Sequence, residues 1–500
     1  MTASSAAQSG KCVMLLLSWT LAFQVCFEEH GCIDTNIQPR WLCGTISSTI
    51  ASYVLAYYRA TPDWKVRKSE LAVLIFLVHV RDPQFYALPA ASRAKNGNIR
   101  VMGFPPIGIM SLSSVLKRAG HECVLFDQAN PETPNPAIIE QIRKRRPELV
   151  GLSFLSTTSY PYAKILARQI RSVDSKVRLA FGGVFATLNA PLVKLQCPEV
   201  DFVCRGDGEQ LILDLLGQLD DPVGVAGLTW ARDGKVINNP NRAAERDLDQ
   251  WPFPDRESLA LDFVESMPLD VPAVLSLDRF TTMQTSRGCP WPCVFCDIPI
   301  FNQGKWRSRS PQHVVEEFNH LQEHGYGAVY FVDDHFLLQP KRIEAICKGI
   351  NDSGVTIHWG CEGRVDSIAQ RLFPAMAKAH CRTLMFGIES GSQKILDRLK
   401  KEQTLEQAET AVTNAKQAGI EIVHGFFVVG NPDETVDDLR ATFDFASRLR
   451  LDTFGFNRLA SIAAHRCGRN TLRAVWSTTR GTGSSISSAP RSTRPACLAR

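Results

Sequence analysis

Three cysteines within eight residues constrain this chain more than any other feature. Cys289, Cys293 and Cys296 have the spacing C-x₃-C-x₂-C in the run Thr285-Ser-Arg-Gly-Cys-Pro-Trp-Pro-Cys-Val-Phe-Cys-Asp297. Thiolates at this spacing can reach three irons of a [4Fe–4S] cube, and the next cysteine along the chain is Cys347. A cube held by three thiolates keeps one iron open to an outside ligand. The spacing therefore favours a substrate-binding redox centre over an electron relay.

Two other uses of these cysteines fit the sequence less well. A zinc site favours paired C-x₂-C modules and a fourth ligand. A disulfide needs an oxidising compartment, and nothing after residue 60 has the character of a secreted protein. Most of the remaining cysteines, such as Cys123, Cys204 and Cys347, fall in expected strands or helices, where a free thiol is usually a small buried hydrophobe. We expect the chain to work in a reducing cytoplasm.

The length of the chain predicts its number of domains, and its net charge excludes a strongly basic protein. Its 500 residues predict about three domains. The formal net charge is +5, but residues 461–500 contain seven Arg and no Lys, Asp or Glu, so residues 1–460 carry −2. This nearly neutral balance gives no sign of a nucleic-acid-binding surface.

Strands and helices alternate along the first half of the chain. The pattern predicts strands at 71–80, 123–126, 149–154, 177–181 and 200–204, and helices at 107–119, 136–145, 162–173 and 209–219. Strands separated by one helix each predict a doubly wound, Rossmann-like parallel sheet, whose ligands bind at the carboxyl ends of the strands. The candidate residues at those ends are Ser153, Gly182, Gly183, Gly206 and Gly208. Tight strand-to-helix turns need glycine even where nothing binds.

A second alternating series follows from residue 280. Strands are expected at 281–285, 328–332, 355–359, 383–386, 421–429 and 453–456, and helices at 311–324, 340–350, 366–379, from about 392, and at 435–448. Six strands of this kind predict a partial, TIM-type (β/α)₆ barrel with its chemistry at the strand carboxyl ends. The polar and glycine residues expected there include Asp333, Arg364, Glu389, Ser390 and Gly430. Asp333 and Ser390 also stand where helix N-caps belong.

The chain divides into five expected segments, which are 1–65, 66–220, 221–279, 280–459 and 460–500. The first is atypical: residues 13–27 form a mostly apolar run that resembles a signal h-region but is too short for a confident membrane span. We interpret it as a non-native extension. The third is a proline-rich connector. The last holds twelve Ser or Thr, seven Arg and no acid, and we expect a disordered or aberrant tail.

The cysteine run, with Phe295 before its last cysteine, resembles the radical S-adenosylmethionine (SAM) superfamily. The resemblance implies that the open iron chelates the amino and carboxylate groups of SAM, which one electron cleaves to a 5′-deoxyadenosyl radical. It also implies that the polar strand ends of the barrel contact SAM. The implied SAM-binding residues are Phe295, Asp333, Arg364, Glu389, Ser390 and Gly430.

The first half resembles the cobalamin-binding domain found in one large radical SAM subfamily. The matching features are Pro105-Pro106-Ile-Gly108, Gly120-His-Glu, the Gly-Gly pair and Arg-Gly-Asp-Gly-Glu209. The resemblance makes Ser153 and the four glycines above the implied cobalamin-binding residues. The Asp-x-His-x-x-Gly motif that supplies a lower histidine ligand to cobalt is absent. The resemblance therefore implies cobalamin bound without a protein histidine.

Within this subfamily the motifs look most similar to the hopanoid C-3 methylase branch of the class B radical SAM methyltransferases. This implies transfer of a methyl group from SAM, through cobalamin, to an unactivated carbon of a small-molecule or lipid substrate. The implied partner is an electron donor such as flavodoxin or ferredoxin, and the implied location is the cytoplasm or the inner membrane surface. The alternatives are an oxidative cyclase of the Mg-protoporphyrin ester type and an inactive cofactor-binding relative. No catalytic side chain is assigned.

Overall fold

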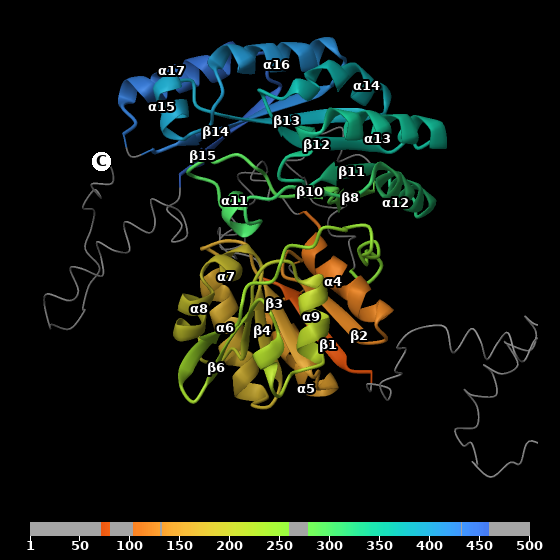
Figure 1. Ribbon diagram of the computed structural model, residues 1–500, viewed down its shortest axis with the longest axis vertical. Helices are drawn as coiled ribbons and strands as arrows, with labels where there is room; N and C mark the ends of the chain where they lie inside the picture. The colour runs from red at the N-terminus through yellow and green to blue at the C-terminus, as the bar shows by residue number, and fades with distance from the viewer. Residues whose placement is uncertain (1–71, 81–103, 131–132, 260–278, 432, 460–500) are drawn as a thin grey trace, which may run out of the picture. The chain divides into compact units, whose positions relative to one another are not determined.

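The computed structural model describes residues 72–80, 104–130, 133–259, 279–431 and 433–459, which form the coloured elements of Figure 1. The expected extension 1–65 and tail 460–500 lie outside the described residues. None of the helices in these described ranges has the length and apolar character needed to cross a lipid bilayer.

Seven strands form the first sheet, in the order β2-β1-β3-β4-β5-β6-β7. The strands are β1 (Leu74–His79), β2 (Glu122–Asp127), β3 (Leu149–Ser153), β4 (Arg178–Gly182), β5 (Phe202–Cys204), β6 (Leu228–Arg232) and β7 (Lys235–Asn238). The first five are parallel, with crossovers through α4 (Ile107–Arg118), α5 (Asn135–Arg145) and α6 (Tyr160–Val173), and through α7 (Val184–Leu188) with α8 (Ala190–Gln196). The predicted doubly wound fold is confirmed.

Alternation along β1 shows how this sheet is covered on both faces. Ile75 and Leu77 pack in the apolar cluster of α4 and α9 (Glu209–Leu216), whereas Phe76 and Val78 pack in that of α5 and α6. Successive side chains of a strand point to opposite faces, so all four are buried when helices lie on both sides.

The hairpin of β6 and β7 is a difference from the sequence expectation. It lies in the expected connector, yet β6 pairs antiparallel with β5 and β7 with β6. Its turn is Asp233-Gly234, and both residues have positive φ, 51° and 72°. Asp-Gly between two short strands is a strong hairpin signal, so the sequence contained the information.

Six parallel strands form the second sheet, in the order β15-β14-β13-β12-β11-β8. They are β8 (Phe280–Met283), β11 (Ala328–Phe331), β12 (His358–Arg364), β13 (Cys381–Glu389), β14 (Ile422–Val429) and β15 (Thr453–Arg458). The helices between them are α12 (Pro311–Glu323), α13 (Pro340–Ser353), α14 (Phe373–Lys378), α15 (Gln393–Arg398), α16 (Leu405–Gln417) and α17 (Val436–Arg448). This parallel half-barrel confirms the predicted fold class.

Two boundaries in the second sheet differ from the expectation and affect the site. Strand β12 ends at Arg364 rather than 359, and β13 continues to Glu389 rather than 386. Arg364 and Glu389 are therefore the last strand residues themselves. The expected helix 366–379 is divided into a short 3₁₀ turn (Ile368–Leu372) and α14.

Candidate functional site at the cysteine loop

The three cysteines lie on a loop that a short antiparallel ladder closes. Strand β9 (Ser286–Arg287) pairs with β10 (Arg307–Ser308), and the single-turn helix α11 (Ile298–Phe301) lies between them. Gly288 follows β9 with φ +92°, and a Cβ there would lie 2.0 Å from the carbonyl oxygen of Lys305. Only glycine allows this close approach, so the Arg-Gly-Cys sequence is needed to fold the loop back on itself.

The cysteines are free and half-buried. Burial raises the pKa of the Cys289 thiol and raises that of Cys296 to about 12, so thiolates here need a positive partner. Among the described residues, no three His, Cys, Asp or Glu side chains are grouped to hold a single metal ion. A [4Fe–4S] cube instead takes one thiolate on each of three irons, and three free thiols on one loop fit that donor set.

Arg364 connects the third strand end of the half-barrel to the loop. Its Nη1 lies 3.6 Å from Cys293 Sγ, and its guanidinium lies 4.1 Å from the Trp291 ring centroid. Its Nε and Nη2 donate to the two carboxylate oxygens of Asp366, at 2.9 and 2.8 Å. Burial alone would lower the pKa of Arg364, but Asp366 raises it, so the group stays charged beside the cysteines.

Two buried polar atoms near Arg364 have no hydrogen-bond partner among the described residues. They are Nε1 of Trp291 and Nδ1 of His335. Burial first, and then the charge of Arg364, lower the pKa of His335 to about 4, so its ring is neutral. Other buried polar atoms of the described residues also lack a partner, so what distinguishes these two is their place beside the loop, where they remain available to a polar ligand.

Asp333 does not point at an open site. Its carboxylate accepts hydrogen bonds from the backbone N–H and hydroxyl of Thr285 and from the hydroxyl of Ser286, each at 2.6 Å. The next residue, Asp334, accepts from the Gly288 N–H at 2.6 Å. Burial raises the pKa of Asp334 to about 6. The structure thus uses the end of β11 to hold the start of the cysteine loop.

The end of β13 carries a buried ion pair. Lys401 Nζ donates to Glu389 Oε1 at 2.7 Å, both side chains are 8% exposed, and Nζ lies 5.9 Å from the Phe295 ring centroid. Glu389 has φ +70°, a strained value for a residue other than glycine. Such strain is common at functional sites. Lys401 gave no sequence signal, because it lies in a loop after α15.

Two further expected residues are engaged in local structure. The Ser390 hydroxyl accepts from the Ser392 N–H and pairs with the Thr442 hydroxyl, each at 3.1 Å. Gly430 has φ +85°, and its N–H donates to Glu434 Oε2 at 2.5 Å. Both shape strand-to-helix turns, but the N-cap residue of α15 is Ser392 rather than Ser390.

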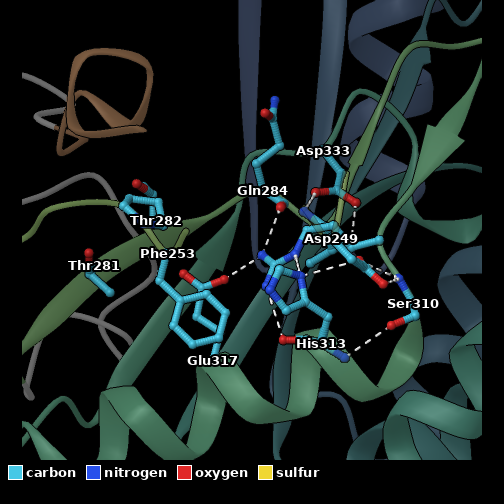
Figure 2. Close-up of polar contacts among 12 residues, drawn as sticks. Asp249, Phe253, Thr281, Thr282, Gln284, Ser310, His313, Glu317 and Asp333 are labelled. Atoms are coloured by element: carbon cyan, nitrogen blue, oxygen red, sulfur yellow. Dashed lines mark hydrogen bonds and ion pairs between the residues drawn. The ribbon is translucent and has the colours of Figure 1, made fainter. Parts of the chain in front are cut away.

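A buried charge network supports the strand that leads into the loop, and Figure 2 shows its residues Thr282, Gln284 and Glu317. Glu317 of α12 is fully buried between Arg256 and Arg309, and Arg256 Nη2 donates to it at 2.6 Å. Arg256 also donates to the Thr282 carbonyl at 2.7 Å, and Arg309 Nη1 donates to the Gln284 carbonyl at 3.2 Å. The network therefore fixes the residues on both sides of the β8 end.

At the carboxyl edge of the first sheet, Gly182 ends β4 and the other expected glycines lie between a strand and a helix. Gly183 has φ +95°, and a Cβ there would lie 2.2 Å from the Phe154 carbonyl oxygen. Gly182 and Gly206, by contrast, have nothing within 4 Å of a built Cβ, and Ser153 ends β3 beside them, paired with Gly182. Gly208 packs against Leu112, 3.0 Å from its Cβ position. Open space at Gly182 and Gly206 suits a flat ligand above this edge.

Comparisons with known proteins agree with this arrangement. Residues 283–446 match the family model of the radical SAM superfamily, and residues 101–216 match that of the B12 binding domain. An uncharacterized methyltransferase from Pyrococcus horikoshii is 34% identical over 71% of this chain and 76% of its own length. The anaerobic magnesium-protoporphyrin IX monomethyl ester cyclase of Rubrivivax gelatinosus is 28% identical, over 70% and 63%. The hopanoid C-3 methylase of Methylococcus capsulatus is 25% identical, over 66% and 61%.

Among solved structures, a radical SAM methyltransferase from Kitasatospora setae with cobalamin and a [4Fe–4S] cluster bound is similar in fold. The TM-score is 0.66 at 16% identity, covering 81% of this chain and 78% of that one.

The chain therefore belongs to the radical SAM superfamily, among its members that also carry a B12-binding domain. It is an enzyme of the radical SAM methyltransferase type, and its cofactors are a [4Fe–4S] cluster, SAM and cobalamin.

Proposed function

We propose that this enzyme transfers a methyl group from SAM, by way of cobalamin, to an unactivated carbon. The observation that carries the proposal is the pairing of a cysteine loop, flanked by Arg364, with a glycine-lined edge of a cobalamin-type sheet. An unactivated sp³ C–H bond is not acidic enough for a side chain to remove its proton, so its chemistry must come from cofactors. Bound cofactors supply a radical and a methyl group, and the protein supplies binding and geometry.

The cysteine loop has the residues for the first of these tasks. Cys289, Cys293 and Cys296 would hold three irons, and Arg364 would place positive charge against the cluster. Trp291 Nε1 and His335 Nδ1 provide unpartnered polar atoms beside the cysteine loop. The Lys401–Glu389 ion pair lies next to the Phe295 ring. The neutral His335 ring can either accept or donate, which suits contact with the polar groups of SAM.

We assign the remaining expected residues different roles. Arg364, Glu389 and Phe295 would contact SAM or the groups that hold it. Asp333 and Ser390 are positioning residues, because their side chains are occupied by local hydrogen bonds. Ser153, Gly182, Gly183, Gly206 and Gly208 would form the cobalamin edge.

For the substrate we propose C-3 of a hopanoid lipid, supported by the hopanoid C-3 methylase relative. A lipid substrate would imply peripheral contact with the inner membrane, and a flavodoxin or ferredoxin would supply electrons in the reducing cytoplasm. The second candidate is oxidative cyclisation of a Mg-protoporphyrin ester, which the cyclase relative favours at slightly higher identity. The two reactions differ in product mass, because only methyl transfer adds CH₂.

The test is expression of this protein in a hopanoid-producing host that lacks 3-methylhopanoids, followed by lipid mass spectrometry. The proposal expects 3-methylhopanoids and, in vitro, 5′-deoxyadenosine from SAM and dithionite. If SAM is cleaved but no methylated hopanoid forms, the substrate proposal is wrong and the class remains. If purified, reconstituted protein forms no 5′-deoxyadenosine, the chain is an inactive relative.

A further inference from the structure

Two arginines of the cysteine loop and two acids of the first sheet form a set of three ion pairs that we name the ionic bridge. It consists of Arg287, Arg307, Asp207 and Glu209. Arg287 and Arg307 lie opposite each other on the β9–β10 ladder. Asp207 and Glu209 belong to the Arg-Gly-Asp-Gly-Glu segment that follows β5, and Glu209 is the first residue of α9.

The contacts of the bridge are close and shared. Arg287 Nη2 donates to Glu209 Oε1 at 2.5 Å, and Arg287 Nη1 lies 3.2 Å from an oxygen of each acid. Arg307 Nη1 donates to Asp207 Oδ2 at 2.5 Å. Asp207 therefore forms ion pairs with both arginines, and Arg287 forms ion pairs with both carboxylates. Such forked pairing fixes orientation as well as distance.

The bridge is also shielded from solvent. Side-chain exposure is 18% for Arg287, 11% for Asp207, 7% for Arg307 and 5% for Glu209. Burial alone would raise the pKa of Asp207, but the two arginines hold it below its usual value. Charges taken out of water at this depth need complete pairing, unlike the exposed pairs elsewhere on the surface.

Each side of the bridge is joined to one cofactor loop. Asp207 stands between Gly206 and Gly208 at the proposed cobalamin edge, and the Gly206 N–H donates to Thr187 Oγ1 of α7 at 3.2 Å. Arg287 is followed directly by Gly288 and Cys289. Arg307, at the far end of the same loop, also donates to Asn302 Oδ1 at 2.7 Å. The Arg287–Asp207 and Arg307–Asp207 ion pairs thus join the two loops directly.

We propose that the ionic bridge makes the binding of cobalamin and the loading of the iron–sulfur cluster depend on each other. This inference rests on the proposed function, because it requires both cofactors at the edges assigned above. Loading the cluster orders the cysteine loop and with it the two arginines, which then hold Asp207 and its flanking glycines in the cobalamin-binding conformation. Coupling of two sites is reciprocal, so cobalamin strengthens retention of the cluster by the same factor.

The test compares hydroxocobalamin affinity in two forms of the full chain, one free of iron and one reconstituted with iron and sulfide. In the wild type we expect the loaded form to bind at least about 5-fold more tightly, the lower end of usual coupling strengths. In Asp207→Asn the ratio of the two dissociation constants should approach one. Glu209→Gln, which keeps the Arg307–Asp207 pair, should give an intermediate ratio and provides a second variant if Asp207→Asn fails to fold.

The matched control is Asp201→Asn. Asp201, directly before β5, pairs with Arg171 of α6 at 2.9 Å, and neither residue belongs to the cysteine loop. This control should keep the wild-type ratio. If the bridge is merely structural, Asp207→Asn should weaken hydroxocobalamin binding equally in the iron-free and the reconstituted form. A ratio of the two dissociation constants that stays at the wild-type value in Asp207→Asn would therefore overturn the inference. A wild-type ratio of one would overturn it too, as would loss of hydroxocobalamin binding in both forms of Asp207→Asn, because Asp207 would then act in binding itself.

These outcomes are separate from failure of the proposed function. If the wild type binds hydroxocobalamin and cleaves SAM while the ratio is insensitive to Asp207, only the coupling is wrong. If the wild type neither binds hydroxocobalamin nor cleaves SAM, the proposed function itself is wrong.

Discussion

The Arg364 guanidinium lies 3.6 Å from the sulfur of Cys293 and is held there by both oxygens of Asp366. A positive charge and an N–H donor beside a cluster thiolate both stabilise the reduced, more negative cluster. Arg364 is therefore placed to set how easily the cluster accepts an electron.

We expect Arg364→Gln to lower the reduction potential of the reconstituted cluster by roughly 50–150 mV, because a unit charge at this distance contributes a few kcal/mol at an effective dielectric constant near 20. The negative charge of Asp366, left without its arginine in this variant, also lowers the reduction potential. Redox titration followed by electron paramagnetic resonance measures the shift. Arg382→Gln, which removes an arginine paired with Glu421, is the control and should leave the potential unchanged. An unaltered potential in Arg364→Gln with full iron content would contradict this role.

Replacement of one loop cysteine tests the ligand set. Cys293→Ala should lose the brown chromophore, most of the bound iron and all 5′-deoxyadenosine formation, because only Cys289, Cys293 and Cys296 have the spacing for a cube. Cys347→Ala removes a thiol buried in α13 and should keep both iron and activity. Retention of SAM cleavage in Cys293→Ala would show that the ligands lie elsewhere.

The buried Glu317 predicts a stability effect with a definite pH dependence. Glu317→Gln should lower the free energy of unfolding by about 3–5 kcal/mol at neutral pH, because it leaves Arg256 and Arg309 buried without their carboxylate. Burial raises the pKa of Glu317, but the two arginines lower it further, so the folded pKa is below the unfolded value. The ion pair thus contributes fully above the ordinary Glu pKa of about 4.3 and is lost as the pH falls below it.

Urea unfolding at several pH values provides the measurement. The difference between wild type and Glu317→Gln should narrow from pH 7 towards pH 3. Glu316→Gln, one residue earlier and exposed, is the matched control and should change stability by no more than about 0.5 kcal/mol. A Glu317→Gln difference that grows on acidification would have the wrong sign for a carboxyl with a lowered pKa.

Substitutions at two adjacent glycines, Gly182 and Gly183, test cofactor binding and folding stability separately. Gly183→Ala should cost about 2–4 kcal/mol, because φ is +95° and the new Cβ would meet the Phe154 carbonyl oxygen at 2.2 Å. Gly182→Ala has nothing within 4 Å of its Cβ and should fold normally, yet bind hydroxocobalamin more weakly if cobalamin fills that space. Urea unfolding and absorbance titration give the two readouts. Normal cobalamin affinity in Gly182→Ala would move the cofactor away from this edge.

The missing Asp-x-His-x-x-Gly motif predicts the ligation of cobalt. The cob(II)alamin form of the protein should lack the nitrogen superhyperfine splitting that a lower histidine ligand produces in electron paramagnetic resonance. His121→Ala should leave the spectrum unchanged, since His121 is instead an acceptor for the Val73 N–H at 3.5 Å. Splitting that disappears in a histidine variant would overturn this expectation.

The sequence alone predicted the two alternating series of strands and helices and the cysteine loop, because these depend on local periodicity and spacing, whereas the order of the strands in each sheet came only from the structure. It also placed Arg364, Glu389 and the glycine turns at strand ends, since parallel strands bring their carboxyl ends to one edge. The Asp-Gly hairpin of β6 and β7 was equally readable, although its antiparallel pairing with β5 was not.

Only the tertiary structure decided which polar side chains remain available to a ligand. Asp333 and Ser390 have the residue types of binding groups, yet neighbours distant in sequence, Thr285 and Thr442, occupy them. The pairings of Lys401 with Glu389, of Glu317 with two arginines and of Asp207 with Arg287 and Arg307 have no local pattern. A buried charge is stabilised by whichever opposite charge the fold brings within reach, and that partner is set by the packing of the whole chain.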